Sequence, residues 1–298
     1  MANDVIKIPF LNPLRFHNIG TGKFACETIP DFENQSLYLQ KFSATDTIKI
    51  QFLLLKNKYF DQYIRIYDSN GNKIANYGPV LKGEYGSLYD VFSTEESFYE
   101  FSADNIYYVV LKVLTIANVE TGLYTNFVSE PFIIIPETAN TLNITYTHDA
   151  NRFDVAFFPN PSLLELQEIF QLRIEGGVPS DGFSPESKDT FYIDQPNDTV
   201  MLNSIPFNTY KFLFGGAPGI PNWLANKLNM ILSLSNVSIN GRRYVKADGA
   251  KLEPIREKYY PFAAWQIELI EPTTEFSLTD GSGLILGDFN NDFNNDYL

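Results

Sequence analysis

Hydrophobic and polar residues alternate along the first half of the chain with the period of two that is typical of half-buried β-strands. In residues 45–55, Ile48, Ile50, Phe52 and Leu54 alternate with polar neighbours. Similar strand patterns occupy residues 62–77, 105–113 and 127–135. About seven strands separated by turns at intervals of about ten residues predict a β-sandwich in this half.

Short signals refine this sandwich. Asn70-Gly71 divides residues 62–77 into two strands of a hairpin, because these two residue types suit the tight turns that join antiparallel strands. Pro131 in the closing strand indicates an edge or a bulge. Tyr107 is either the tyrosine corner of a fibronectin-type sandwich or a buried strand aromatic.

The second half has a mixed pattern. One segment, residues 221–234, places Leu224, Leu228, Ile231 and Leu232 at helical spacing and predicts an amphipathic helix. Strand patterns occupy residues 142–148, 170–177, 189–194, 209–216 and 263–270, and residues 237–245 form a hairpin pattern that turns at Asn240-Gly241. This half therefore reads as an α+β domain.

A polar break at residues 136–140 marks the boundary between the two patterns. We predict a mainly β protein in which an Ig/fibronectin-type β-sandwich precedes an α+β domain with one amphipathic helix. The predicted parts are an N-terminal arm (1–36), the β-sandwich (37–136), the α+β domain (137–275) and a flexible acidic and aromatic C-terminal arm (276–298).

Composition limits the possible functions. The 298 residues carry a net charge of −14, which argues against sequence-independent binding to nucleic acid because phosphate contacts need a basic surface. Cys26 is the only cysteine, so we expect no internal disulfide, no antibody-type cysteine pair and synthesis in a reducing cytoplasm. The N-terminal sequence shows no signal peptide pattern, and no apolar run reaches the length of a membrane span.

Patterns for catalysis and cofactor binding fail at their diagnostic positions. Residues 20–23 contain the Gly-Lys of a phosphate loop, but Phe24 follows where Ser or Thr is required. His17 and His148 are the only histidines, too few for a zinc cluster and without a plausible catalytic triad. We therefore predict that the protein is not an enzyme and has no cofactor and no metal. The basic cluster Arg242, Arg243 and Lys246 is either a solvated hairpin tip or a docking point for an acidic partner.

The C-terminal sequence GDFNNDFNNDYL (287–298) resembles a calcium loop in its first acidic positions. The position that requires glycine is Phe293, and the chain stops before the bidentate glutamate. Drawn as a strand, this segment separates acidic residues from aromatic ones. It is either a disordered acidic tail or an assembly arm that adds to a neighbouring sheet. The predicted anchors of such an arm are Leu284, Ile285, Leu286, Phe289, Phe293 and Tyr297.

Two groups of residues carry a resemblance to a known family. LYLQKFSATDTIKIQF (37–52) with FVSEPF (127–132), and GIPNWLANKLNMILSLSNVSINGRRYVKADGAKLEP (219–254) with WQIEL (265–269), resemble structural proteins of tailed phages that infect Bacteroidetes, of the crAss-like phage type. The resemblance implies a virion protein that is made in the host cytoplasm.

We therefore expect a non-catalytic structural component of a phage virion, namely a tail, collar or ring protein. Its expected partners are copies of itself in a ring and neighbouring tail or portal-associated proteins, with no nucleic acid and no membrane. The alternative is a carbohydrate-binding module or a glycan-binding surface protein, for which Tyr59, Phe60, Tyr63 and Tyr85 are candidate contacts.

Overall fold

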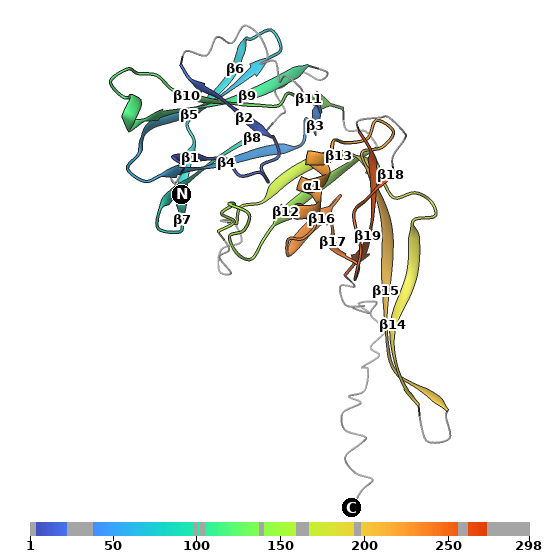
Figure 1. Ribbon diagram of the computed structural model, residues 1–298. Helices are drawn as coiled ribbons and strands as arrows, with labels where there is room; N and C mark the ends of the chain where they lie inside the picture. Colours follow the sequence, from blue (N-terminus) through green and yellow to red (C-terminus); the bar gives the residue numbers. More distant parts are fainter. Residues whose placement is uncertain are drawn as a thin grey trace, which may run out of the picture.

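The computed structural model describes residues 4–22, 38–97, 101, 105–136, 140–158, 167–193, 198–255 and 262–272. The protein is mainly β, as predicted, and α1 (Asn222–Ile231) is the α-helix among the described residues. The strands form one four-stranded sheet and one 15-stranded sheet that continues from the first half into the second. Figure 1 shows this large sheet passing through the body and ending in a long hairpin.

The first half packs two sheets face to face. One contains β1 (Ile6–Lys7), β4 (Thr47–Leu55), β8 (Tyr89–Ser97) and β7 (Val80–Tyr85), in the order β1-β4-β8-β7. The other contains β6 (Lys73–Tyr77), β5 (Tyr59–Asp68), β9 (Ile106–Thr115), β10 (Thr125–Ser129) and β2 (Phe16–Thr21). Ile50 and Phe52 of β4 share a buried core with Val109 and Leu111 of β9. The sandwich-like packing that alternation predicted is therefore present.

Turns and core aromatics follow the sequence signals. The Asn70-Gly71 turn joins β5 to β6, with Gly71 at a φ of 80°. A short 3-10 helix, η1 (Ile116–Asn118), follows β9. Tyr107 is buried in the sandwich core, where its ring contacts Phe101 and Phe132.

Pro131 separates β10 from β11 (Phe132–Ile135), and the strand changes its partner at this break. Before the break β10 pairs with β2, and after it β11 pairs in parallel with β3 (Gln40–Ser43). On its other side β3 pairs with β13 (Phe170–Gly177) through Lys41 and Arg173. Strands on both sides of the predicted boundary near residue 136 therefore belong to one sheet, which joins the two halves.

The second half continues this sheet in the order β13-β12-β16-β17-β19-β15-β14. Its strands are β12 (Thr141–Thr147), β14 (Phe183–Ile193), β15 (Thr199–Phe214), β16 (Asn236–Ile239), β17 (Arg242–Lys246), β18 (Glu253–Ile255) and β19 (Ala264–Glu271). The helix α1 buries Leu224, Leu228 and Ile231 in the core of this half. The helix and the hairpin at Asn240-Gly241 confirm two local predictions.

The predicted N-terminal arm is part of the body over its described residues, 4–22. β1 pairs with β4, and β2 pairs with β10. Leu11, between these strands, is fully buried in the core of the second half. The side chain of Lys227 on α1 donates a hydrogen bond to the carbonyl oxygen of Asn12 at 2.5 Å. This segment therefore bridges the two halves instead of extending from them.

Candidate functional site

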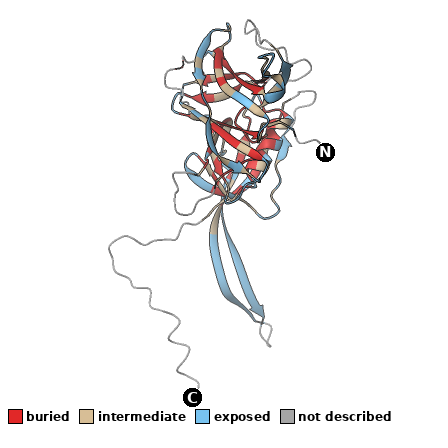
Figure 2. Ribbon diagram, turned by 90° about the vertical axis from the view of Figure 1, so that its left-hand side faces the viewer, coloured by how far each residue is buried: buried red, intermediate tan, exposed pale blue. Residues whose placement is uncertain are grey.

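Among the described residues, the most exposed feature is the hairpin of β14 and β15. The two strands pair from Phe183–Tyr210 to Ile193–Thr199, and every residue of β14 is exposed. Figures 1 and 2 show the hairpin leaving the body as an isolated two-stranded projection. The sequence prediction placed residues 189–194 and 209–216 as separate strands within a domain. We call residues 183–193 and 199–207 the finger.

Two prolines face outward on the finger. The N–H of Lys211 donates to the carbonyl oxygen of Gly182 at 2.7 Å. Hydrogen-bonded and non-hydrogen-bonded pairs alternate along an antiparallel ladder, so Pro185 and Pro206 direct their backbone nitrogens away from the hairpin partner. β19 pairs with β15 as far as Asn208, opposite Glu271, where β19 ends and Pro272 follows. At the next outward position of β15, Pro206 has no N–H to donate to a neighbouring strand.

The same prolines protect the edges of the finger. Among the described residues, no other strand pairs with β14, and none pairs with β15 between residues 199 and 207. Exposed strand edges invite pairing with other chains, and proline at an outward position is a common way to prevent it. The finger is therefore built to make contacts through its side chains and its tip.

Apolar side chains are concentrated at the tip of the finger. Phe191 and Met201 are cross-strand partners, and Tyr192 and Val200 form the next pair on the opposite face. Ile193 and Leu202 are 62% and 63% exposed. Since both faces of the tip are apolar, a flat surface could cover only one of them.

The stem of the finger combines polar and apolar side chains. The hydroxyl groups of Ser187 and Ser204 donate hydrogen bonds to the carboxylate of Asp189 at 3.0 and 2.6 Å. These bonds join both strands on one face. Ile205 in the stem is 52% exposed and Phe183 at its base is 50% exposed, so exposed apolar side chains occur along the finger as well as at its tip.

A close approach of backbones anchors the base of the finger. Gly176 of β13 pairs with Phe214 of β15. A Cβ atom at Gly176 would lie 2.1 Å from the carbonyl oxygen of Leu213, so only glycine allows this contact. Phe212 and Phe214 extend from the base into the core of the second half. The finger is thus a continuation of a packed strand.

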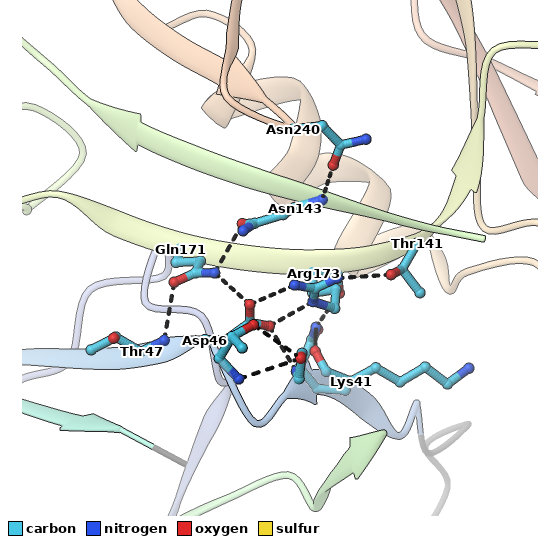
Figure 3. A network of polar contacts seen from close by, with 11 residues as sticks. Lys41, Asp46, Thr47, Thr141, Asn143, Gln171, Arg173 and Asn240 are labelled. Atoms are coloured by element: carbon cyan, nitrogen blue, oxygen red, sulfur yellow. Dashed lines mark hydrogen bonds and ion pairs between the residues drawn. The ribbon is translucent and has the colours of Figure 1, made fainter. Parts of the chain in front are cut away.

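A buried polar network fixes the two halves to each other (Figure 3). Arg173 of β13 makes two hydrogen bonds of 2.6 Å with Asp46, in the turn between β3 and β4. Asp46 also accepts hydrogen bonds from Gln171 at 2.7 Å and from the backbone N–H of Ser43 at 2.8 Å. Both charged side chains are almost fully buried. Such a bidentate pair allows little rotation, so the finger has a rigid attachment to the sandwich.

The sequence prediction missed a second contact between the halves. Gln51 is one of the polar residues that alternate with Ile50 and Phe52 and that a half-buried strand would expose, but it is fully buried. Its side-chain amide exchanges two hydrogen bonds of 2.8 Å with the backbone of Ala156. The second half covers this face of β4, and alternation within one strand contains no information about such a distant neighbour.

Another buried group of charges lies where the N-terminal segment meets α1. The Glu130 carboxylate lies 3.4 Å from Arg15 and 3.3 Å from the ring of His17. Burial raises the pKa of Glu130 to about 7, although Arg15 and Lys227 oppose the shift. Burial also lowers the pKa of Lys227 to about 7 and lowers that of His17. These groups hold the bridging segment in place.

His148 and the basic cluster, which the sequence analysis singled out, contact neighbouring groups of the fold. His148 shares hydrogen bonds with the side chain and backbone of Ser235. Arg242 lies 3.7 Å from Glu271, Arg243 donates to the carbonyl oxygen of Ser235, and Lys246 donates to Asn229. The basic cluster is therefore engaged with neighbouring strands and α1.

The four candidate glycan contacts do not form one exposed row. Phe60 is 66% exposed. Tyr59 donates a hydrogen bond to Asp90 and packs against the sandwich core, while Tyr85 packs on a smaller buried cluster. The ring of Tyr63 lies between Tyr124 and Arg65. Phe60 is therefore the most exposed of these four side chains.

Leu284, Ile285, Leu286, Phe289, Phe293 and Tyr297, the predicted arm anchors, lie outside the described residues. Within the described part of the chain, no group of three or more His, Cys, Asp or Glu side chains could hold a metal ion. No helix in that part is long and apolar enough to cross a membrane.

Comparison of the chain with protein-family models, curated proteins and solved structures gave no match. The inference of function therefore depends on the residues of this chain and on their geometry.

Proposed function

We propose that this protein is a non-catalytic structural subunit that joins a larger assembly by inserting its finger into a neighbouring protein. The observation that carries the proposal is the apolar tip, with Phe191, Ile193, Met201 and Leu202 more than half exposed at the end of an isolated two-stranded projection. Exposed apolar groups of this size mark interaction sites on soluble proteins. Aromatic residues and methionine are also enriched in protein interfaces.

A protein partner fits the tip better than a lipid surface. In the sequence, Asp194 directly follows β14 and Asp198 directly precedes β15. Insertion of the apolar residues next to them into a bilayer would bring these carboxylates to the membrane, at a large desolvation cost. In a cleft between proteins, the same carboxylates can remain in water or meet basic side chains at the rim.

The assembly that we propose is a phage virion, with this chain as a tail, collar or ring subunit that is made in the host cytoplasm. The resemblance of residues 37–52 and 219–254 to virion proteins supports this identity, and the assignment of the sandwich as Ig/fibronectin-type belongs to the same proposal. The expected partners are further copies of this chain and neighbouring tail or portal-associated proteins. The scattered aromatic side chains give no comparable support to glycan binding.

The test is incorporation into particles. Mass spectrometry of purified virions should find the chain at a fixed number of copies per particle. A variant with Phe191→Ser and Met201→Ser should fold but be incorporated at least tenfold less than wild type when the two are expressed together. Thr190→Ser in the stem is the matched control and should be incorporated normally. Absence of the chain from virions, or turnover of a glycan or peptide substrate, would refute the proposal.

A further inference from the structure

A groove lies between α1 and the segment that joins β17 to β18. Its volume is about 390 Å³, which is within the range of small-molecule sites on proteins. One wall is formed by α1, and the other by residues 250–252 together with Trp265 of β19. These described lining residues lie outside the finger, so the groove is a separate feature of the second half.

A large bulge beside β19 forms one wall of the groove. β17 ends at Lys246, and β18 joins the same edge of β19 at Glu253. Residues 247–252 therefore lie opposite only residues 267 and 268 of β19. Gly249 has a φ of 71°, a conformation that glycine adopts without strain, and it turns the surplus residues out of the ladder. Bulges are frequent next to functional sites, where they direct side chains to new positions.

The wall formed by α1 carries a row of amide groups. The exposed residues of this helix are Asn222, Asn226 and Asn229, and all three line the groove. They share one face because residues three and four positions apart are neighbours on a helix. Asparagine is a weak helix former, so three of them in a ten-residue helix lower its stability. A local choice that weakens an element is characteristic of a functional site.

These amides suit a ligand that is rich in hydroxyl groups. Each amide has an acceptor oxygen and two N–H donors, and each hydroxyl group of a sugar both donates and accepts. Lys246 donates a hydrogen bond to Oδ1 of Asn229 at 2.6 Å, which orients this amide and leaves its N–H groups as donors. Lys251, the charged residue among the described lining, is exposed and can remain in water. A neutral ligand therefore leaves no buried charge unpaired.

The facing wall is apolar. Leu252 and Trp265 pack against the core of the second half, and both remain partly exposed. The C–H groups of a pyranose ring give it an apolar side, which can pack on this wall while the hydroxyl groups at its edge meet the amides. Two apolar side chains offer little surface to the large buried anchors that dominate protein interfaces. The mixture of walls therefore favours a saccharide over a protein segment.

We propose that the groove between α1 and residues 250–252 binds a neutral saccharide, with the three amides of α1 on its hydroxyl groups and Leu252 and Trp265 against its ring. This binding goes beyond the assembly function and does not depend on it. The groove is also separate from the four aromatic residues of β5 and β7 that the sequence suggested as glycan contacts.

The experiment uses the full chain and an array of neutral oligosaccharides with α- and β-linked hexoses, followed by titration calorimetry with the oligosaccharide that binds best. Asn226→Ala should weaken this binding about tenfold, the effect of one lost hydrogen bond. Alanine is the better helix former, so the same variant should melt at an equal or higher temperature than the wild type. Weaker binding without a loss of stability separates contact with the ligand from a structural role. Asn203→Ala, at an exposed position in the finger, is the matched control and should bind as the wild type does.

Three results would overturn the proposal. The first is a wild type that binds none of the neutral oligosaccharides on the array. The second is binding that Asn226→Ala leaves unchanged. The third is capture of a peptide from a displayed library that Asn226→Ala abolishes, without saccharide binding, which would make the groove a peptide site. Asn226→Ala should enter virions as the wild type does, so a chain that binds saccharide but is absent from virions would contradict the assembly function alone.

Discussion

Removal of the Asp46 carboxylate should destabilise the whole body, because Asp46 lies at the junction of the two halves. Its partner Arg173 is 5% exposed and makes two hydrogen bonds of 2.6 Å to it. Breaking a buried ion pair by removing one partner costs about 3–5 kcal/mol, since the remaining charge stays buried without compensation. Asp46→Ala also removes the acceptor for Gln171 and for the N–H of Ser43. We expect a loss near the upper end of this range.

Urea unfolding followed by tryptophan fluorescence provides the assay. Both tryptophans, Trp223 and Trp265, lie in the second half, whereas Asp46 lies in the first. A lower midpoint in Asp46→Ala would therefore also show that the halves are coupled. The double variant Asp46→Leu with Arg173→Met should recover most of the loss, because replacement of both partners leaves no unpaired charge.

The control for this prediction is the more exposed ion pair of Lys56 and Glu84, at 2.6 Å. Glu84→Ala should cost less than about 1 kcal/mol, because solvent screens a pair of this kind. A loss in Asp46→Ala as small as that of Glu84→Ala would refute the reasoning. A double variant no more stable than Asp46→Ala would show that the cost does not arise from the unpaired arginine.

Leu228→Asp should destabilise the protein by several kcal/mol, since Leu228 of α1 is fully buried in the core of the second half and a new carboxylate there has no partner; unchanged thermal unfolding would contradict this. Between pH 7 and 10.5 the unfolded chain keeps the Lys227 proton that the folded protein, with a pKa of about 7, has lost. The free energy of unfolding should therefore rise with pH in this window, and Lys227→Met should remove that rise in urea titrations. Glu130, with its pKa raised to about 7, has the opposite effect below pH 7, because the folded protein keeps a proton that the unfolded chain has lost. The free energy of unfolding should therefore fall as the pH rises from 4.5 to 7, and it should fall less steeply in Glu130→Gln than in the wild type. Truncation after Gly283 should leave the melting temperature unchanged but reduce incorporation into particles. Phe289→Ala with Phe293→Ala should reproduce this loss of incorporation. A larger effect of Asp292→Asn, rescued by calcium, would instead indicate a metal site.

Local features of the fold were predictable because their causes are local. The alternation in β4, the turns at Asn70-Gly71 and Asn240-Gly241, and the helical spacing of Leu224 and Leu228 each depend on neighbours within a few residues. The structure confirms the strands, the two hairpins and the helix at these positions.

The candidate site depends on interactions that a single strand pattern does not contain. Residues 183–214 have the composition of strands. Part of this segment forms a projection only because the pairing of β15 with β19 does not extend beyond Asn208. Pro185 and Pro206 were the available signals, since proline within a strand pattern indicates an edge. The burial of Gln51 and Arg173 could not be predicted from the sequence. Only their hydrogen-bond partners offset the cost of burying these polar side chains, and those partners are distant in sequence.

The central claim is that the apolar tip of the finger becomes buried when the protein enters its assembly. A cysteine at Thr199, beside the tip, in a Cys26→Ser background allows this to be measured directly by the rate of maleimide labelling. Thr199 is exposed in the isolated chain, so the free protein should label as fast as the unfolded chain. In purified particles the rate should fall at least tenfold. Equal labelling rates in the particle and in the free protein would contradict the account.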